Sequence, residues 1–248
     1  MKRNISRKVK RELQKIIINV GTILIVLFIL SMIYYFQNGS FPTLKNHSYT
    51  MEELPAYNGK DYIIINNNEP DFTDEEKKST TSFEKYSNLD YLGRCSTAFA
   101  NIGKDLMPTK EREYIGKVKP SGWRISKYDF IEGEYLYNRC HLIAYSLTAE
   151  NDNKNNLITC TRNLNAVVMN KFELKVLGYI RRTGNHVLYK VTPVFEGNNL
   201  LASGVEMQAY SVEDSGKLKF HIYAYNRQDK IEIDYKTGQN KLIEAKNE

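Results

Sequence analysis

Hydrophobic and polar positions alternate in short runs along most of the chain, with turn residues between them. In the second half, such runs lie at 186–195, 204–212, 217–226 and 230–238. Earlier runs of the same kind lie at 61–66, 95–103, 135–143 and 157–161. Segments rich in Val, Ile, Tyr and Phe between Gly, Asn and Pro are typical of strands joined by turns. The pattern therefore predicts a mostly antiparallel sheet.

One segment, residues 163–182, has helical periodicity instead. Its apolar residues recur at fourfold spacing and form one stripe: Leu164, Val168, Phe172, Val176 and Ile180, with Tyr179 as an alternative in the last place. Such a stripe is typical of a helix that packs one face on a core. Arg181 and Arg182 suit the negative end of this helix, and Gly184 is suited to end it. With the polar stretch 71–90 expected to form short helix and loop, the fold class is α+β, a sheet around one central helix.

An apolar stretch near the N-terminus predicts a membrane anchor. Residues 16–36 contain 21 residues without a charge, and a helix needs roughly 20 to cross a bilayer. The stretch exceeds the hydrophobic part of a signal peptide, and no small-residue cleavage site follows it. Seven basic residues and one acidic residue precede it, which places this tail in the cytoplasm. We therefore expect a cytoplasmic tail at 1–15, a transmembrane signal anchor at 16–36, a stalk at 37–55 and one extracellular domain at 56–248.

The net charge of +6 belongs to the N-terminal tail, because the rest of the chain holds equal numbers of basic and acidic residues. The basic pI is therefore no argument that the outer domain binds nucleic acid, which would require a basic patch on that domain. A local groove around the turn at 120–123 could supply such a patch. Its candidate residues are Lys117, Lys119, Arg124 and Lys127.

The segment YNRCHLI places a histidine beside a cysteine, and several kinds of site would fit it. His141 could be a general base, half of a thiol pair, a metal ligand or a core histidine. Neighbouring residues on a strand point to opposite faces, so Cys140 and His141 cannot act together as nucleophile and base. A Cys/His hydrolase using Cys140 or Cys160 would need a distant histidine. His186 and His221 both lie in strand-like runs, where a structural role is the default.

Three cysteines, Cys95, Cys140 and Cys160, lie in the outer part of the chain, where disulfides can persist. An odd number leaves at least one of them without a partner in the chain. Together with His141 they could supply four zinc ligands, but no C-x-x-C spacing supports a zinc site.

On the predicted helix, Asn165, Met169 and Glu173 step by four residues beside the apolar stripe. Mg²⁺ takes oxygen ligands and keeps several waters, so one amide oxygen with a nearby carboxylate can hold a hydrated ion. A histidine on a facing strand could then deprotonate a water near that ion. The same spacing also fits the solvated face of a helix, so the pattern alone leaves both interpretations open.

The run YNRCHLIAYSLTAENDNKNNLITCTRNLNAVVMNKFE resembles the DNA/RNA non-specific endonucleases of the ββα-metal, or His-Me finger, superfamily. It is most similar to the membrane-anchored DNA-entry nucleases of Gram-positive bacteria. Their signature is D/N-R-G/C-H, then an N-x-x-N-L segment, then a helix with a metal-binding asparagine followed by a glutamate. These positions fall on Asn138, Arg139, Cys140, His141, Asn156, Asn165 and Glu173. Further similar segments, from LGRC to IDYKTG, extend the resemblance over residues 56–238.

The resemblance implies a ββα-metal core that hydrolyses phosphodiester bonds of DNA, with RNA as a further substrate, and leaves 5′-phosphate ends. His141 would act as general base, and Asn165 would bind a single Mg²⁺, with Mn²⁺ as an alternative. Glu173 would reach metal-bound water, Asn156 would brace the site, and Arg112 would stabilise the charge of the transition state. Because such groups address phosphate and sugar, little sequence preference is expected.

Two positions depart from the family pattern. Many relatives have aspartate in place of Asn138, whose neutral amide could still orient a neighbour by hydrogen bonding. Many also have an arginine where this chain has Leu177. If that arginine steadies phosphate in relatives, then Arg112, Arg139 or Arg181 must substitute for it here.

The cysteine of the NRCH motif is a variant of the most similar group of relatives. Since the side chain of Cys140 faces away from His141, it is expected to pair with Cys95. The alternative function is a catalytically inactive, anchored nucleic-acid receptor of the same fold. Against it, His141 and Asn165 are both present, although an inactive protein would be expected to lose them first.

Overall fold

The computed structural model describes residues 7–38, 49–50 and 52–244, in two compact units, 1–46 and 47–248. The first unit contains one helix, α1 (Arg7–Asn38). Within the described part of the chain, no helix qualifies by length and hydropathy as a membrane-crossing segment. The anchor at 16–36 therefore stays a prediction from the sequence. Most of the expected stalk, including His47, lies outside the described residues.

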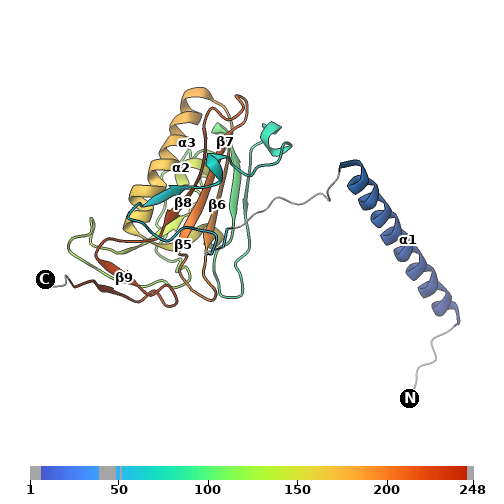
Figure 1. Ribbon diagram of the computed structural model, residues 1–248, viewed down its shortest axis with the longest axis horizontal. Helices are drawn as coiled ribbons and strands as arrows, with labels where there is room; N and C mark the ends of the chain where they lie inside the picture. The colour runs from blue at the N-terminus through green and yellow to red at the C-terminus, as the bar shows by residue number, and fades with distance from the viewer. Residues whose placement is uncertain (1–6, 39–48, 51, 245–248) are drawn as a thin grey trace, which may run out of the picture. The chain divides into compact units, whose positions relative to one another are not determined.

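A six-stranded antiparallel sheet forms the centre of the second unit (Figure 1). Its strands, in spatial order, are β1 (Tyr62–Ile64), β8 (Lys219–Tyr225), β7 (Gly204–Ser211), β6 (Val187–Val194), β3 (Ala98–Ile102) and β2 (Phe83–Tyr86). Alternate residues of each strand, such as Val191, Met207 and Ile222, enter the main core on one face. The antiparallel sheet predicted from the sequence is thus confirmed.

The helix predicted at 163–182 packs on this face of the sheet (Figure 1). It begins as a π-helical turn, η5 (Asn163–Met169), and continues as α3 (Asn170–Thr183). All five residues of the predicted apolar stripe are buried. Gly184 ends the helix as expected, with φ at 79° and its N–H donating to the Ile180 carbonyl at 2.8 Å. Met169 departs from the prediction, because it lies in the core and not on a polar strip.

A separate hairpin-like pair of strands precedes this helix. β4 (Tyr137–His141) pairs with β5 (Leu157–Thr161), antiparallel, with His141 opposite Leu157. The intervening residues contain a short helix, α2 (Tyr145–Thr148), and one 3-10 turn, η4 (Lys154–Asn156). Since η5 and α3 follow at once, the chain has the β-β-α order that the resemblance implies.

The disulfide joins Cys140 to Cys160, so the expected Cys95–Cys140 pair is wrong. The register of β4 and β5 explains the pairing, because it sets Cys140 opposite Ile158, two residues from Cys160 on the same core-facing side. The two Cα atoms are 5.9 Å apart. Cys95 is a buried free thiol that donates to the carbonyl oxygen of Leu157 at 3.1 Å.

The segment 71–90 contains a strand as well as the expected short helix. Glu76–Lys78 form a 3-10 turn, η2, but β2 pairs with β3 and forms one edge of the sheet. Two further 3-10 turns are η1 (Asn66–Asn68) and η3 (Lys104–Leu106). The last predicted strand run, 230–238, contains β9 (Ile231–Ile233), which lies outside the large sheet and pairs with β10 (Asn240–Leu242), a strand that was not predicted.

Candidate active site

His141 ends strand β4 and is held in one tautomer by the backbone of the following loop. Its Nε2 donates to the carbonyl oxygen of Asn151 at 2.6 Å. A carbonyl can only accept, so in the neutral ring the proton sits on Nε2 and Nδ1 keeps its lone pair. The guanidinium of Arg112 lies 3.4 Å from Nδ1. The side chain is only 7% exposed.

Burial lowers the pKa of His141 to about 4, and the neighbouring Arg112 charge adds to this effect. The hydrogen bond to the Asn151 carbonyl opposes the shift without cancelling it. A charged ring loses hydration when buried, and a second positive charge nearby repels it. His141 is therefore neutral near pH 7, and its unprotonated Nδ1 accepts a 3.4 Å hydrogen bond from Arg112.

Asn156 supports the chain directly after His141. Its side chain is fully buried. The amide oxygen accepts from the Ile143 N–H at 2.9 Å, and the amide nitrogen donates to the Ile143 carbonyl at 3.0 Å. These two bonds tie the end of the β4–β5 connection to its beginning, which fixes the course of the backbone just after His141.

Asn165 lies in the π-helical turn, with its amide oriented by Asn138 of strand β4. The Asn165 Nδ2 donates to Asn138 Oδ1 at 3.0 Å. Among the described residues, no donor contacts Asn165 Oδ1 within hydrogen-bonding distance, so this oxygen can accept or ligate. Asn138 is neutral, but it orients the Asn165 amide by this hydrogen bond, as the sequence analysis allowed. Single π turns inside α-helices are frequent at functional sites, and this one holds Asn165.

Glu173 lies two turns further along the same helix. Burial raises its pKa to about 8, against the opposing positive charge of Arg112. Arg112 in turn has a pKa lowered by burial, an effect that Glu173 counteracts. The two side chains thus influence each other across the space in front of His141.

These residues line one open cleft of about 490 Å³. The cleft contains His141, Asn165, Glu173, Arg112 and Arg139, together with Glu132, Ala144, Tyr145, Ser146, Arg162, Ala166 and Asn170. The structure therefore brings five of the six predicted site residues to one surface. Asn156 is the exception, because it lies beneath the cleft as a buried brace.

Oxygen atoms at this cleft fit a hard divalent cation. The amide oxygen of Asn165 is unengaged, and the Glu173 carboxyl group lines the same space. One such oxygen, with water completing the shell, is a common way for proteins to hold Mg²⁺. The set lacks thiolates and offers a single histidine, which disfavours a soft-metal site.

Two arginines of the cleft differ from the expectation: Arg139 is bound to protein backbone, and Arg162 is an additional lining residue. Arg139 binds the backbone of a loop, donating to the carbonyls of Val118 at 2.5 Å and Gly116 at 2.9 Å. Arg162 was not predicted. It lines the cleft and donates to Asn138 and Glu132. Its position three residues before Asn165, which puts both on one side of a helical turn, was the available signal.

The proposed basic patch is only partly assembled. Lys119 and Arg124 line a shared hollow with Gln239 and Asn240. Lys127 forms an ion pair with Glu134 at 2.9 Å, which reduces its availability to a ligand. Lys117 lines none of these hollows.

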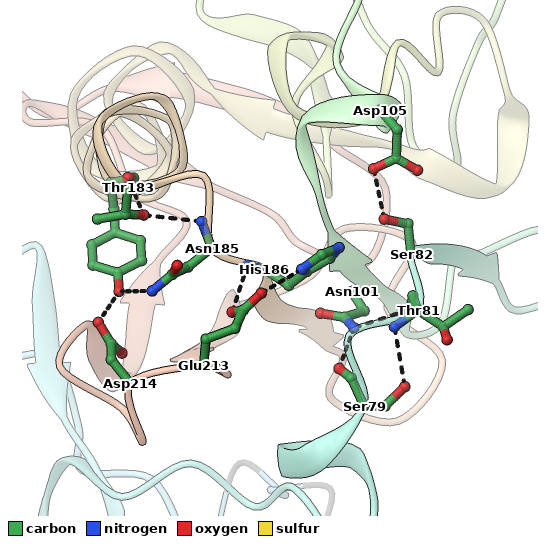
Figure 2. Close-up of polar contacts among 11 residues, drawn as sticks. Ser79, Thr81, Ser82, Asn101, Asp105, Thr183, Asn185, His186, Glu213 and Asp214 are labelled. Carbon is green, nitrogen blue, oxygen red and sulfur yellow. Dashed lines mark hydrogen bonds and ion pairs between the residues drawn. The ribbon is translucent and has the colours of Figure 1, made fainter.

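The two other histidines among the described residues, His186 just before β6 and His221 in β8, have hydrogen-bonded structural positions. Figure 2 shows His186 facing Glu213, whose two carboxylate oxygens accept from the backbone N–H at 2.8 Å and from Nδ1 at 2.6 Å. His221 is fully buried on the opposite side of the large sheet, with Glu206 2.6 Å from Nε2 and the Glu69 carbonyl 2.8 Å from Nδ1.

Neither a thiol hydrolase nor the cysteine zinc site is compatible with this arrangement. Cys140 and Cys160 are joined, and burial raises the pKa of the remaining thiol, Cys95, to about 12. A thiol with that pKa is not a nucleophile near neutral pH.

In the described residues, a His/Asp/Glu group with metal-like spacing consists of Asp71, Glu206 and His221, away from the cleft. Within that group, both ring nitrogens of His221 are already hydrogen-bonded, to Glu206 and to the Glu69 carbonyl.

The cleft and the β-β-α order define a class of nucleic-acid hydrolases, and comparison with known families agrees. A family model described as "DNA/RNA non-specific endonuclease" matches residues 74–213, more than half of the chain. The chain belongs to this family and is a nuclease of the hydrolase class.

Solved structures of other nucleases share the fold. NucA from Streptococcus agalactiae without metal superimposes with a TM-score of 0.66 at 23% identity, over 78% of this chain and 92% of NucA. The same nuclease with a bound magnesium ion gives 0.63 at 23% identity, over 72% and 85%. The Sda1 nuclease with a bound zinc ion gives 0.55 at 29% identity, over 66% and 81%.

Proposed function

We propose that the chain is a metal-dependent, non-specific endonuclease that cuts DNA, and RNA as a further substrate, leaving 5′-phosphate ends. One observation carries the proposal. A neutral histidine, whose unprotonated Nδ1 accepts a 3.4 Å hydrogen bond from Arg112, and an asparagine with an unengaged Oδ1 line the same cleft. A scissile phosphate between them would meet a proton acceptor on one side and a metal ligand on the other.

Each side chain has a role in this proposal. His141 Nδ1 accepts the proton of the attacking water, a contribution on the order of 10²- to 10⁴-fold. Arg112 lies close enough to His141 to contact the same phosphate and offset its developing charge. Asn156 fixes the loop behind His141. Arg139 steadies the wall of the cleft by its hold on Gly116 and Val118.

Mg²⁺ is the proposed cofactor, with Mn²⁺ as an alternative. Asn165 would ligate it, Asn138 would orient that ligand, and Glu173 would contact its hydration shell. When bound, the ion polarises the phosphate and stabilises the leaving oxygen. The relatives solved with magnesium and with zinc support a divalent ion in this fold. The oxygen donors of the cleft favour Mg²⁺ over the softer ion.

We further propose that residues 16–36 hold the nuclease on the outer face of the cell membrane. The support comes from the uncharged stretch and the basic tail before it. The apolar side chains of α1 that the structure describes, from Ile16 to Leu30, are also exposed. This proposal is independent of the cleft chemistry.

Nicking of supercoiled plasmid by washed membranes from cells that express the full chain tests both proposals. We expect Mg²⁺-dependent nicking that sediments with the membranes, stops with EDTA and survives a thiol alkylator. Binding of plasmid without cleavage at any metal concentration would favour the inactive receptor. Activity that EDTA leaves unchanged would exclude the metal mechanism, and activity only in the soluble fraction would exclude the anchor.

The lowered pKa of His141 predicts activity into mildly acidic solution. The ring must be neutral to accept a proton, and with a pKa of about 4 it stays neutral well below the usual value of 6.5. The acid limb of kcat/KM should therefore fall near pH 4, not near 6.5. In Arg112→Gln the limb should move to higher pH, because a neighbouring positive charge is lost. A limb that stays near 6.5 in both proteins would contradict the assignment.

A further inference from the structure

A second hollow, of about 590 Å³, adjoins the catalytic cleft and exposes aromatic and aliphatic side chains. We call it the aromatic hollow. Tyr114 is 82% exposed there, Ile125 is 75% exposed and Tyr135 is 48% exposed. Large apolar side chains that are exposed in a concave part of the surface more often mark a binding site than a surface that stays unoccupied.

The wall of the aromatic hollow is a built arrangement. The Arg139 guanidinium stacks over the Trp123 ring at 3.9 Å and also donates to the carbonyls of Gly116 and Val118. Tyr114 lies directly against Gly116, where any side chain would collide with its phenol ring. Arg139 thus fixes both the loop that supports Tyr114 and the indole ring of Trp123.

The aromatic hollow is continuous with the catalytic cleft. The two share five lining residues, namely Arg112, Glu132, Arg139, Arg162 and Asn165. Arg124 lines the hollow but not the cleft. Four arginines and one glutamate therefore accompany the exposed aromatic rings, which gives the hollow a positive character.

We propose that the aromatic hollow binds unpaired nucleotides next to the scissile phosphate, with a base stacked on Tyr114 and the backbone beside Arg124 and Arg162. The inference rests on the proposed nuclease function and specifies its substrate. Aromatic rings combined with arginines in one groove are the chemistry that retains single-stranded nucleic acid without reading its sequence.

Duplex DNA cannot use this surface in the same way. Its base faces are covered by their neighbours, and a protein meets mainly phosphates and base edges. A duplex in the cleft would contact the arginines but leave Tyr114 without a ring to stack on. The geometry therefore favours single-stranded segments over paired ones.

Tyr114→Ala in the full chain tests this proposal. Cleavage and binding are measured on one labelled strand of mixed sequence, alone and annealed to its complement. For the single strand, we expect kcat/KM to fall on the order of 10-fold, since stacking on one aromatic ring has about this effect. For the duplex, we expect little change. Tyr91→Ala is the matched control, because Tyr91 is 83% exposed and lines neither hollow.

Fluorescence anisotropy in the presence of EDTA separates this proposal from the nuclease function. If the wild-type chain binds the single strand more tightly than the duplex, and Tyr114→Ala alone removes the difference, the subsite is supported even if no cleavage occurs. Equal losses on both substrates, or none on either, would overturn it. Cleavage without strand preference would overturn the subsite and leave the nuclease function standing.

Discussion

Replacing His141 with alanine is expected to lower the rate of phosphodiester cleavage by on the order of 10²- to 10⁴-fold while the fold persists. The reason is the lone pair on Nδ1, which the 2.6 Å hydrogen bond from Nε2 to Asn151 keeps unprotonated and which can take up a proton. Loss of that bond leaves one backbone carbonyl without its donor, which costs about 1–3 kcal/mol in stability. The measurement is kcat on supercoiled plasmid at saturating Mg²⁺, together with the thermal unfolding midpoint.

His186→Gln is the matched control for this variant. His186 directly precedes strand β6, is bound to Glu213 and is not part of the cleft lining. It should keep nearly full activity, with only a change in stability. Full activity in folded His141→Ala would exclude His141 as the general base.

The elements that could be predicted from the sequence are those whose signal is local. The stripe from Leu164 to Ile180 identified the helix because each residue contacts the core through the same face. Gly184 marked its end for an equally local reason, a left-handed backbone that glycine adopts without strain. The core strands were recognisable because they are long and apolar.

The elements that were missed depend on distant partners. β2 has only four residues, FEKY, with two of them charged, and it exists because β3 pairs with it. The disulfide was mispaired because side-chain direction on β4 excludes His141 as a neighbour of Cys140 but does not select among the other cysteines. That choice depends on the register with β5, which the sequence does not specify.

In the candidate site, too, the residues marked by local motifs could be predicted, and the features that depend on distant contacts could not. His141, Asn165 and Glu173 followed from motifs in sequence order, and the structure brings them to one cleft. The tautomer of His141 could not be predicted, because its acceptor is a backbone carbonyl ten residues later. Arg162 was missed because no motif marks it; its relevance comes from the contact with Asn138 on strand β4.

Replacing Asn165 with alanine should weaken metal binding and lower activity on the order of 100-fold or more at limiting Mg²⁺. The change removes the unengaged amide oxygen and also releases Asn138 from its 3.0 Å hydrogen bond. Asn165→Asp retains an oxygen ligand but loses the donor to Asn138, so we expect an intermediate rate. The readouts are the Mg²⁺ concentration for half-maximal nicking and calorimetric binding of Mn²⁺.

The matched control is Asn163→Ala, in the same helical turn. Its side chain bonds to Asp61 at 2.9 Å and is not part of the cleft lining. It should alter neither the metal dependence nor the Mn²⁺ affinity. If Asn165→Ala binds Mn²⁺ as tightly as the unmodified chain and needs no more Mg²⁺, the ion is held elsewhere. The free oxygen of Asn165 would then have to be explained as a contact to the nucleic acid itself.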